Sequence, residues 1–179
     1  SLKMTNLDWQ VMSAPGHDPH SVILFEPANK ILVSADALWA NGFGVVFPEL
    51  EGEDAFGEVG ATLDLIERLS PHTVIPGHGR VFSDVSGALA RARSRLAQFT
   101  EQPERHTKHA VKVLLKFKLL ELQRLPLANF CAWAQATPYL ADVHRRHGGG
   151  SFNEWVLPLI DELVRSGVAS RDGDWVINA

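Results

Sequence analysis

The stretch Ser13–Leu38, which reads SAPGHDPHSVILFEPANKILVSADAL, decides the fold. It contains two short apolar runs, Val22–Phe25 and Lys30–Val33, separated by the break Pro27-Ala28-Asn29. Proline cannot donate a hydrogen bond to a β-ladder, and asparagine tolerates turn dihedrals, so the break predicts a turn. The two runs are therefore expected to form a β-hairpin.

Candidate metal ligands flank this hairpin. His17 precedes it and Asp36 follows it, so the antiparallel return of the chain is expected to bring the two side chains together. A further strand, predicted at Thr73–Ile75, runs directly into Pro76-Gly77-His78-Gly79 and places a second histidine at a strand end. Two neutral imidazoles and a carboxylate are a donor set that zinc accepts. A single histidine is more simply an ordinary loop residue, but the repeated Pro-Gly-His at strand boundaries favours a metal site.

These motifs resemble those of the metallo-β-lactamase-fold hydrolases. That family carries its ligands on loops at the strand ends of an αββα sandwich: a His-x-His-x-Asp-His motif, a Gly-His, an Asp that bridges two metals, and a final Gly-His. Pro15-Gly16-His17 resembles the first Gly-His, Ser34-Ala35-Asp36-Ala37 the bridging aspartate, and Pro76-Gly77-His78-Gly79 the last motif. The His-x-His-x-Asp-His motif does not occur in this sequence, because His106/His109 and His144/His147 have the wrong spacing. The chain therefore resembles the second half of such a domain followed by a tail.

The resemblance implies a dinuclear zinc hydrolase. The metals would lower the pKa of a bound water to about 7, so that hydroxide attacks an ester, thioester, lactone or phosphodiester of a small-molecule substrate. His17 would ligate one metal and His78 the other, and Asp36, the candidate catalytic residue, would bridge both. Two zinc ions are expected per complete site. Because the first-half ligands are absent from this sequence, we expect the isolated chain to bind metal weakly or not at all and to be inactive.

Composition limits the class of protein. The 179 residues suit one ordinary domain or two small ones, and an apolar content of 45% is sufficient for a packed core. No apolar run approaches the length of a membrane span, and no signal peptide is visible at the start. The single cysteine, Cys131, excludes an internal disulfide and indicates a reducing, cytoplasmic setting. Its apolar surroundings predict a buried structural thiol rather than a nucleophile.

The remainder of the first part predicts two helices. Apolar residues recur at helical spacing over Asp54–Leu69, and a second helix is expected over Ser83–Gln102 with Ser83 or Asp84 as its cap. Arg91, Arg93 and Arg95 alternate along the second helix and therefore spread around it, which favours a solvated face over a phosphate site. The apolar loop Leu38–Pro48 is equally consistent with a pocket wall and with core packing.

A change of composition at Gln102-Pro103 divides the chain. Residues 1–102 hold 7 Lys and Arg against 13 Asp and Glu, and they are assigned to the metallo-β-lactamase-like half-domain. Residues 103–179 are expected to contain three helices and a hairpin: 106–124, 127–136 with Pro126 at its first position, 151–165 capped by Ser151, and a hairpin turning at Arg171-Asp172-Gly173-Asp174. This order resembles a winged-helix module. The expected fold class is α/β (α+β), half of an αββα sandwich followed by a small winged-helix domain.

The tail does not favour nucleic-acid recognition. The expected third helix carries Glu154, Asp161 and Glu162 against Arg165 alone, whereas groove recognition needs cations and base-edge donors. A structural or dimer-forming module is therefore preferred. The one basic cluster, residues 144–147, is interpreted as a solvated loop.

Two alternatives to the hydrolase stay open. One is a non-catalytic interaction module, and the other is a ribonuclease or another nucleic-acid-processing member of the same fold. The strands at 22–25 and 31–33 are expected to lack covering surface within residues 1–102, so the expected partner is the missing first half of the sandwich or a second copy of the chain. The loop Phe43–Phe47 and the apolar tail helices are the candidate contact surfaces, and no membrane partner is expected.

Overall fold

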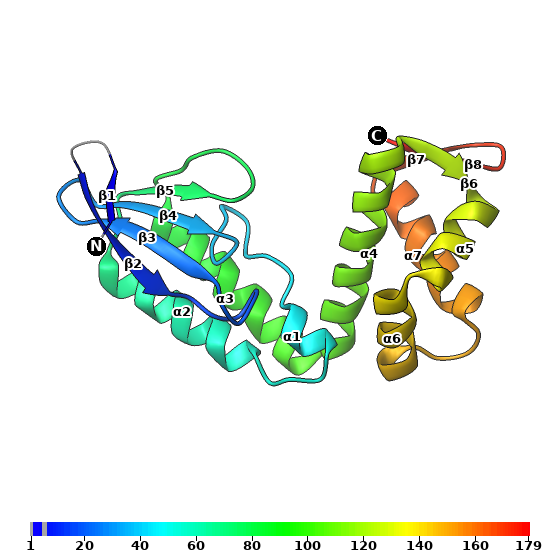
Figure 1. The fold of residues 1–179 in the computed structure, drawn as a ribbon, viewed down its shortest axis with the longest axis horizontal. Coiled ribbons are helices and arrows are strands. Elements are labelled where there is room, and N and C mark those ends of the chain that lie inside the picture. The colour runs from blue at the N-terminus through cyan, green and yellow to red at the C-terminus, as the bar shows by residue number, and fades with distance from the viewer. Residues whose placement is uncertain (1, 5–6) are drawn as a thin grey trace. The chain divides into compact units, whose positions relative to one another are not determined.

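The computed structural model describes residues 2–4 and 7–179, with side chains described from residue 7 onward. The chain divides into two compact units, Ser1–Pro103 and Glu104–Ala179 (Figure 1). Each unit contains its own sheet and its own helices, so the predicted mixed α/β class is confirmed. Within the described residues, no helix has both the length and the apolar character that a membrane crossing requires.

The first unit is built on a five-stranded sheet with the strand order β1-β2-β3-β4-β5. The strands are β1 (Leu2–Met4), β2 (Leu7–Ser13), β3 (Val22–Glu26), β4 (Ile31–Ala35) and β5 (Thr73–Pro76). Neighbouring strands are antiparallel except β4 and β5, which run parallel. The predicted hairpin is present as β3 and β4, in which Phe25 lies opposite Leu32.

A buried carboxylate holds the turn of this hairpin. Glu26 is 2% exposed, and its two oxygens accept hydrogen bonds from the backbone amides of Ala28 at 2.8 Å and Asn29 at 2.7 Å and from the Asn29 side chain at 2.9 Å. Burial by itself raises the pKa of Glu26, but these three bonds to its ionised form outweigh burial and leave the pKa below its usual value.

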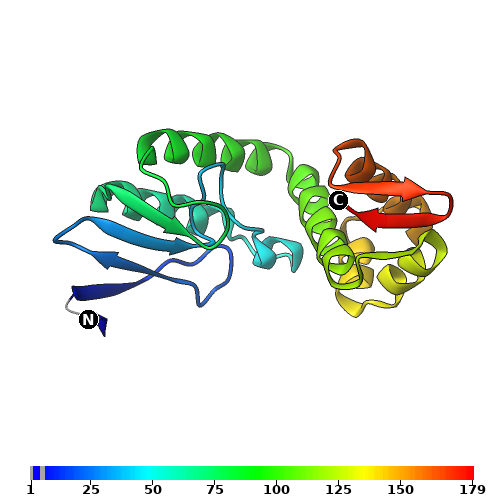
Figure 2. The same ribbon diagram turned by 90° about the horizontal axis from the view of Figure 1, so that it is seen from above.

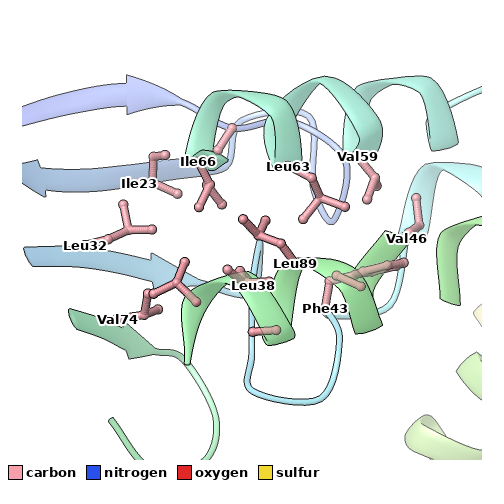
Figure 3. Close-up of a cluster of buried hydrophobic side chains, with 14 of the residues drawn as sticks. Ile23, Leu32, Leu38, Phe43, Val46, Val59, Leu63, Ile66, Val74 and Leu89 are labelled. Carbon is pink, nitrogen blue, oxygen red and sulfur yellow. The ribbon is translucent and has the colours of Figure 1, made fainter. Parts of the chain in front are cut away.

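Two helices cover one face of the sheet. They are α2 (Phe56–Leu69) and α3 (Val85–Glu101), and Figure 2 shows both on the same side of the strands. Each begins two residues later than the sequence pattern suggests, and α3 is capped by Asp84, whose side chain accepts a bond from the Gly87 amide at 3.1 Å. Between the helices and the strands lies a close-packed core that includes Ile23, Leu32, Leu63, Ile66, Val74 and Leu89 (Figure 3).

The expectation that the hairpin lacks covering surface is therefore wrong for one face. The other face, which we call the open sheet face, carries Val11, Leu24, Val33 and Ile75 in one row, because the strand registers place these residues side by side. Val11 is 50% exposed and Ile75 38% exposed, while Leu24 and Val33 are half-buried.

The loop after β4 belongs to the core. Leu38, Phe43, Val45 and Val46 are all buried, and the chain then enters the short helix α1 (Phe47–Leu50). Of the two interpretations of this loop, core packing describes these four side chains. The expectation that the loop Phe43–Phe47 forms a contact surface is wrong for Phe43, Val45 and Val46, which are covered within the chain, while Phe47 is half-buried.

The second unit contains a helix that the sequence did not indicate. Its elements are α4 (Pro103–Leu122), β6 (Arg124–Pro126), α5 (Leu127–Ala136), α6 (Pro138–His147), α7 (Phe152–Arg165), β7 (Ala169–Asp172) and β8 (Trp175–Asn178). The basic cluster at 144–147 forms the last turn of α6 rather than a loop. Pro126 lies in β6 and precedes the first turn of α5 instead of occupying it.

Local signals account for the ends of this unit. Ser151 caps α7 (Phe152–Arg165), as the sequence predicts, and the structure adds a reciprocal capping box between Ser151 and Glu154. The hairpin β7–β8 pairs Asp172 with Trp175, so its two-residue turn is Gly173-Asp174, and Gly173 has a φ of +53°. Cys131 is buried as expected, and burial raises the pKa of its thiol, which therefore stays protonated.

A buried histidine gives a testable dependence on pH. His106, in the first turn of α4, is 1% exposed, and burial, aided by the charges of His109 and His147, lowers its pKa to about 4. The unfolded side chain titrates near 6.5, so the unfolded state binds the proton first as the pH falls. We expect the free energy of unfolding to decrease between about pH 6.5 and pH 4, by an amount on the order of 3 kcal/mol.

Urea denaturation at a series of pH values measures this effect. His106→Leu removes the titrating group, so the free energy of unfolding of this variant should decrease less than that of the wild type between about pH 6.5 and pH 4. His72→Gln alters an exposed histidine and should follow the wild type. Identical pH dependence in wild type and His106→Leu would contradict the assignment.

Candidate metal centre

The candidate site lies at the edge where the parallel strands β4 and β5 end. Asp36 follows the last residue of β4, and His78 follows β5 after Gly77. Parallel neighbours end at the same edge of a sheet, so both side chains reach the same region. The register shifts between Val33 and Ala35, and Ala35 takes a left-handed φ of +46°. The Gly77 amide donates to the Ala35 carbonyl at 2.8 Å and joins the two strand ends.

His17 reaches this edge from the loop between β2 and β3. Its Nε2 lies 3.3 Å from Oδ2 of Asp36, and its Nδ1 lies 2.6 Å from the carbonyl oxygen of Val45. A carbonyl only accepts hydrogen bonds, so Nδ1 carries the proton, and in the neutral ring Nε2 presents its lone pair towards Asp36. The hydroxyl of Thr62 on α2 donates to the Pro15 carbonyl at 2.9 Å and ties the same loop to the helix.

His78 occupies the other side of the carboxylate. Its Nε2 lies 3.8 Å from Oδ1 of Asp36, and its ring lies 5.1 Å from the ring of Trp39 in an edge-to-face arrangement. The indole N–H of Trp39 donates to the same Oδ1 at 3.1 Å. The structure therefore brings His17, Asp36 and His78 together, with one histidine at each carboxylate oxygen.

Glycines make this close approach sterically accessible. A Cβ on Gly44 would lie 2.7 Å from Nδ1 of His17 and 2.9 Å from Cβ of Asp36. A Cβ on Gly77 would lie 2.7 Å from Oδ1 of Asp36. Real Cβ atoms do not make contacts this short, so a larger residue at either position would displace a candidate ligand.

Some residues of the site were not predicted. The apolar loop after Asp36 contributes Trp39, Gly44 and the Val45 carbonyl to the site. The sequence predicted that this loop is a pocket wall or part of the core, but it did not indicate which of its groups turn back towards the carboxylate. Within residues 2–4 and 7–179, no three potential ligands converge on one point, since the two histidines face different oxygens of Asp36.

Comparison with known proteins identifies one family model. Residues 2–78 match the model of the metallo-beta-lactamase superfamily. Among solved structures, one similar protein is a metallo-beta-lactamase family protein from Thermus thermophilus. The match covers 99% of this chain and 52% of that protein, with a TM-score of 0.47 and 16% sequence identity. The match to a beta-lactamase domain protein from Burkholderia ambifaria covers 99% of this chain and 49% of that protein, with a TM-score of 0.47 and 19% sequence identity.

A third solved structure, BLEG-1 B3 metallo-beta-lactamase, matches 50% of this chain over 42% of its own, with a TM-score of 0.42 and 25% identity. The chain thus spans about half the length of the first of these solved structures. A comparison with curated proteins gave no match.

Gly44 provides a test of the packing around the site. We expect Gly44→Ala to destabilise the chain by roughly 1–3 kcal/mol, because its Cβ overlaps His17 and Asp36. The matched control is Gly57→Ala on α2, where a Cβ would meet no atom within 4 Å and a helical alanine is favoured. Thermal unfolding gives the stabilities, and the His17 ring resonances report local displacement. Equal stability of the two variants, with unmoved His17 resonances, would contradict the packing described here.

Proposed function

We propose that this chain is part of a metallo-β-lactamase superfamily hydrolase and supplies three ligands of a dinuclear zinc centre. One observation carries the proposal: the Asp36 carboxylate has the Nε2 atom of His17 at one oxygen and the Nε2 atom of His78 at the other. The match of residues 2–78 to the superfamily model supports it.

The donor atoms fit zinc in chemistry and spacing. Two donors on one tetrahedral zinc, each about 2.0–2.1 Å from the metal, lie about 3.4 Å apart. The separations here are 3.3 Å for His17 and Asp36 and 3.8 Å for His78 and Asp36. His17 and Asp36 would hold one ion, and His78 and Asp36 the other. When bound, the ions would provide a nucleophile from water at neutral pH for an ester, thioester, lactone or phosphodiester substrate.

The chain's own groups prepare these ligands. The Val45 carbonyl holds the His17 ring in one orientation and one tautomer, which leaves Nε2 for the metal. The Trp39 N–H bonds one oxygen of Asp36 and limits rotation of the carboxylate. The same indole contacts the His78 ring edge to face, and the His78 side chain stays 62% exposed, so this ligand is open to solvent.

Zinc titration tests the ligand assignment. We expect the isolated chain to bind zinc weakly, because it offers two ligands per ion where a structural site uses four. His17→Ala and His78→Ala should each weaken binding further, and Asp36→Asn should weaken both sites. His72→Ala, at an exposed position, is the control.

Isothermal titration calorimetry measures the affinities, and elemental analysis gives the metal content. Unchanged affinity in all three ligand variants would overturn the assignment. Two tightly held zinc ions per chain would overturn the view that this chain contains only part of the centre. A panel of a thioester, a lactone and single-stranded RNA is expected to show no turnover by the isolated chain.

A second candidate function is an interaction module, and the open sheet face favours it. Val11, Leu24, Val33 and Ile75 form an apolar row on the face opposite the two helices, and the two outer members of the row are exposed. Burying such a surface recovers about 25 cal/mol per Å² of apolar area. A second copy of the chain, or the other half of a sandwich, is the proposed occupant.

Sedimentation at micromolar concentration tests this association. Val22 is 48% exposed and lies two residues from Leu24 along β3, so it belongs to the open sheet face as well. We expect the wild type to sediment as more than a monomer, and the double variant Val11→Lys/Val22→Lys, which places two charges on this face, to sediment as a monomer. Val81→Lys changes a valine outside the sheet that is 58% exposed, more than Val11 or Val22, and should behave as the wild type. A monomeric wild type would remove the support for this function.

The second unit favours a structural role over nucleic-acid binding. Its element order, with a strand after the first helix and a hairpin after the last, resembles a winged-helix module. On α7, Asp161 pairs with Arg171 at 2.7 Å and Glu162 pairs with Lys112 at 2.8 Å. These carboxylates neutralise the cations that a phosphate backbone would need, so a ribonuclease-type role gains no support from this surface.

A further inference from the structure

The three arginines of α3 are not equivalent. Arg91 pairs with Asp84 at 3.0 Å, and Arg93 pairs with Asp64 at 2.8 Å and Glu67 at 2.7 Å. For Arg91 and Arg93, the prediction that they lie on the solvated face of the helix is confirmed. Arg95 differs, because among the described residues no hydrogen bond or ion pair reaches its guanidinium.

The guanidinium of Arg95 is nevertheless half-buried. It lies so close to Gly42 that a Cβ there would come within 2.5 Å of its Nη1 atom. Burial without a partner lowers the pKa of Arg95, which reflects the cost of removing a cation from water. Residues 1–102 hold 13 aspartates and glutamates, yet none of those that the structure describes pairs with this arginine.

Arg95 packs on the loop that forms the candidate metal centre. Gly42 accepts a hydrogen bond from the Trp39 amide at 2.6 Å, and Trp39 bonds Asp36 through its indole. Gly44, two residues further on, packs against His17 and Asp36. Two residues of extended chain span at most about 7 Å, so a short length of loop separates the contact with Arg95 from the contact with the ligands.

We propose that Arg95 binds an anionic group, a carboxylate or a phosphate, on the substrate handled at the candidate metal centre. This inference rests on the proposed hydrolase function and adds a substrate class to it. A guanidinium presents a planar fork of N–H donors that matches the two oxygens of a carboxylate or phosphate. An arginine held against a glycine, without a carboxylate partner in the described part of the chain, keeps this fork available for a ligand.

Nuclear magnetic resonance of the metal-free full chain tests the proposal. Inorganic phosphate and acetate are titrated separately at constant ionic strength, with chelator present, while the side-chain Nε–H signals of the arginines are followed. We expect a saturable shift at Arg95 and none at Arg91 or Arg93. Saturation by phosphate alone indicates a phosphorylated substrate, and saturation by acetate indicates a carboxylate.

The variant Arg95→Lys keeps the charge and loses the fork, so its phosphate or acetate affinity, read at the Gly42 amide, should fall at least about tenfold. Arg93→Lys is the matched control on the same helix and should leave affinity unchanged. A spectrum in which Arg95 does not shift, or in which Arg91 and Arg93 shift equally, overturns the proposal. Unaltered affinity in Arg95→Lys does so as well. Because no zinc and no turnover are involved, this result is independent of the zinc titration.

Discussion

The first unit depends on how the chain leaves β4. Ala35 adopts a left-handed φ of +46°, a conformation that costs a non-glycine residue on the order of 1 kcal/mol. The surrounding structure holds it there. The Ala35 carbonyl accepts bonds from the Gly77 amide at 2.8 Å and the Trp39 indole at 3.2 Å, and the Asp36 carbonyl accepts one from the Gly44 amide at 2.8 Å. These bonds fix the direction of the Asp36 side chain before any ligand arrives.

The same constraint explains the packing of the loop that follows. Ser34 is fully buried, and its hydroxyl donates to the Leu38 carbonyl at 2.6 Å, which closes a tight turn around Asp36. Leu38 and Phe43 then enter the core, while Gly44 beyond them allows the backbone to approach His17 and Asp36. The loop thus contributes to the hydrophobic core and to the candidate site at once. A change that loosens its packing is also a change in ligand geometry.

Three acidic residues of the first unit, Glu26, Glu49 and Asp84, stabilise local structure. Glu26 holds the hairpin turn, and Glu49 accepts bonds from the amides of Ala55 and Phe56, both at 2.7 Å, where α2 begins without a capping side chain of its own. Asp84 caps α3 and pairs with Arg91. The first part of the chain is acidic, yet Arg95 has no carboxylate partner among the described residues. One reason is that these three carboxylates already bind backbone amides or other side chains.

By itself the sequence determined the hairpin, the two covering helices, the cap at Ser151 and the neighbourhood of His17, Asp36 and His78. These features depend on turn residues, apolar spacing and strand ends, all of which act over a few residues. Helix α6 was missed because ten residues with only Leu140 and Val143 buried give too short an apolar pattern. Only the tertiary structure decided that Glu49 binds the first amides of α2, six and seven residues further on, that Trp39 turns back to Asp36, and that Arg95 lies against Gly42 without a partner among the described residues. Each depends on which side chains meet across the fold, because hydrogen bonds and ion pairs form between groups that packing, rather than sequence proximity, brings within reach.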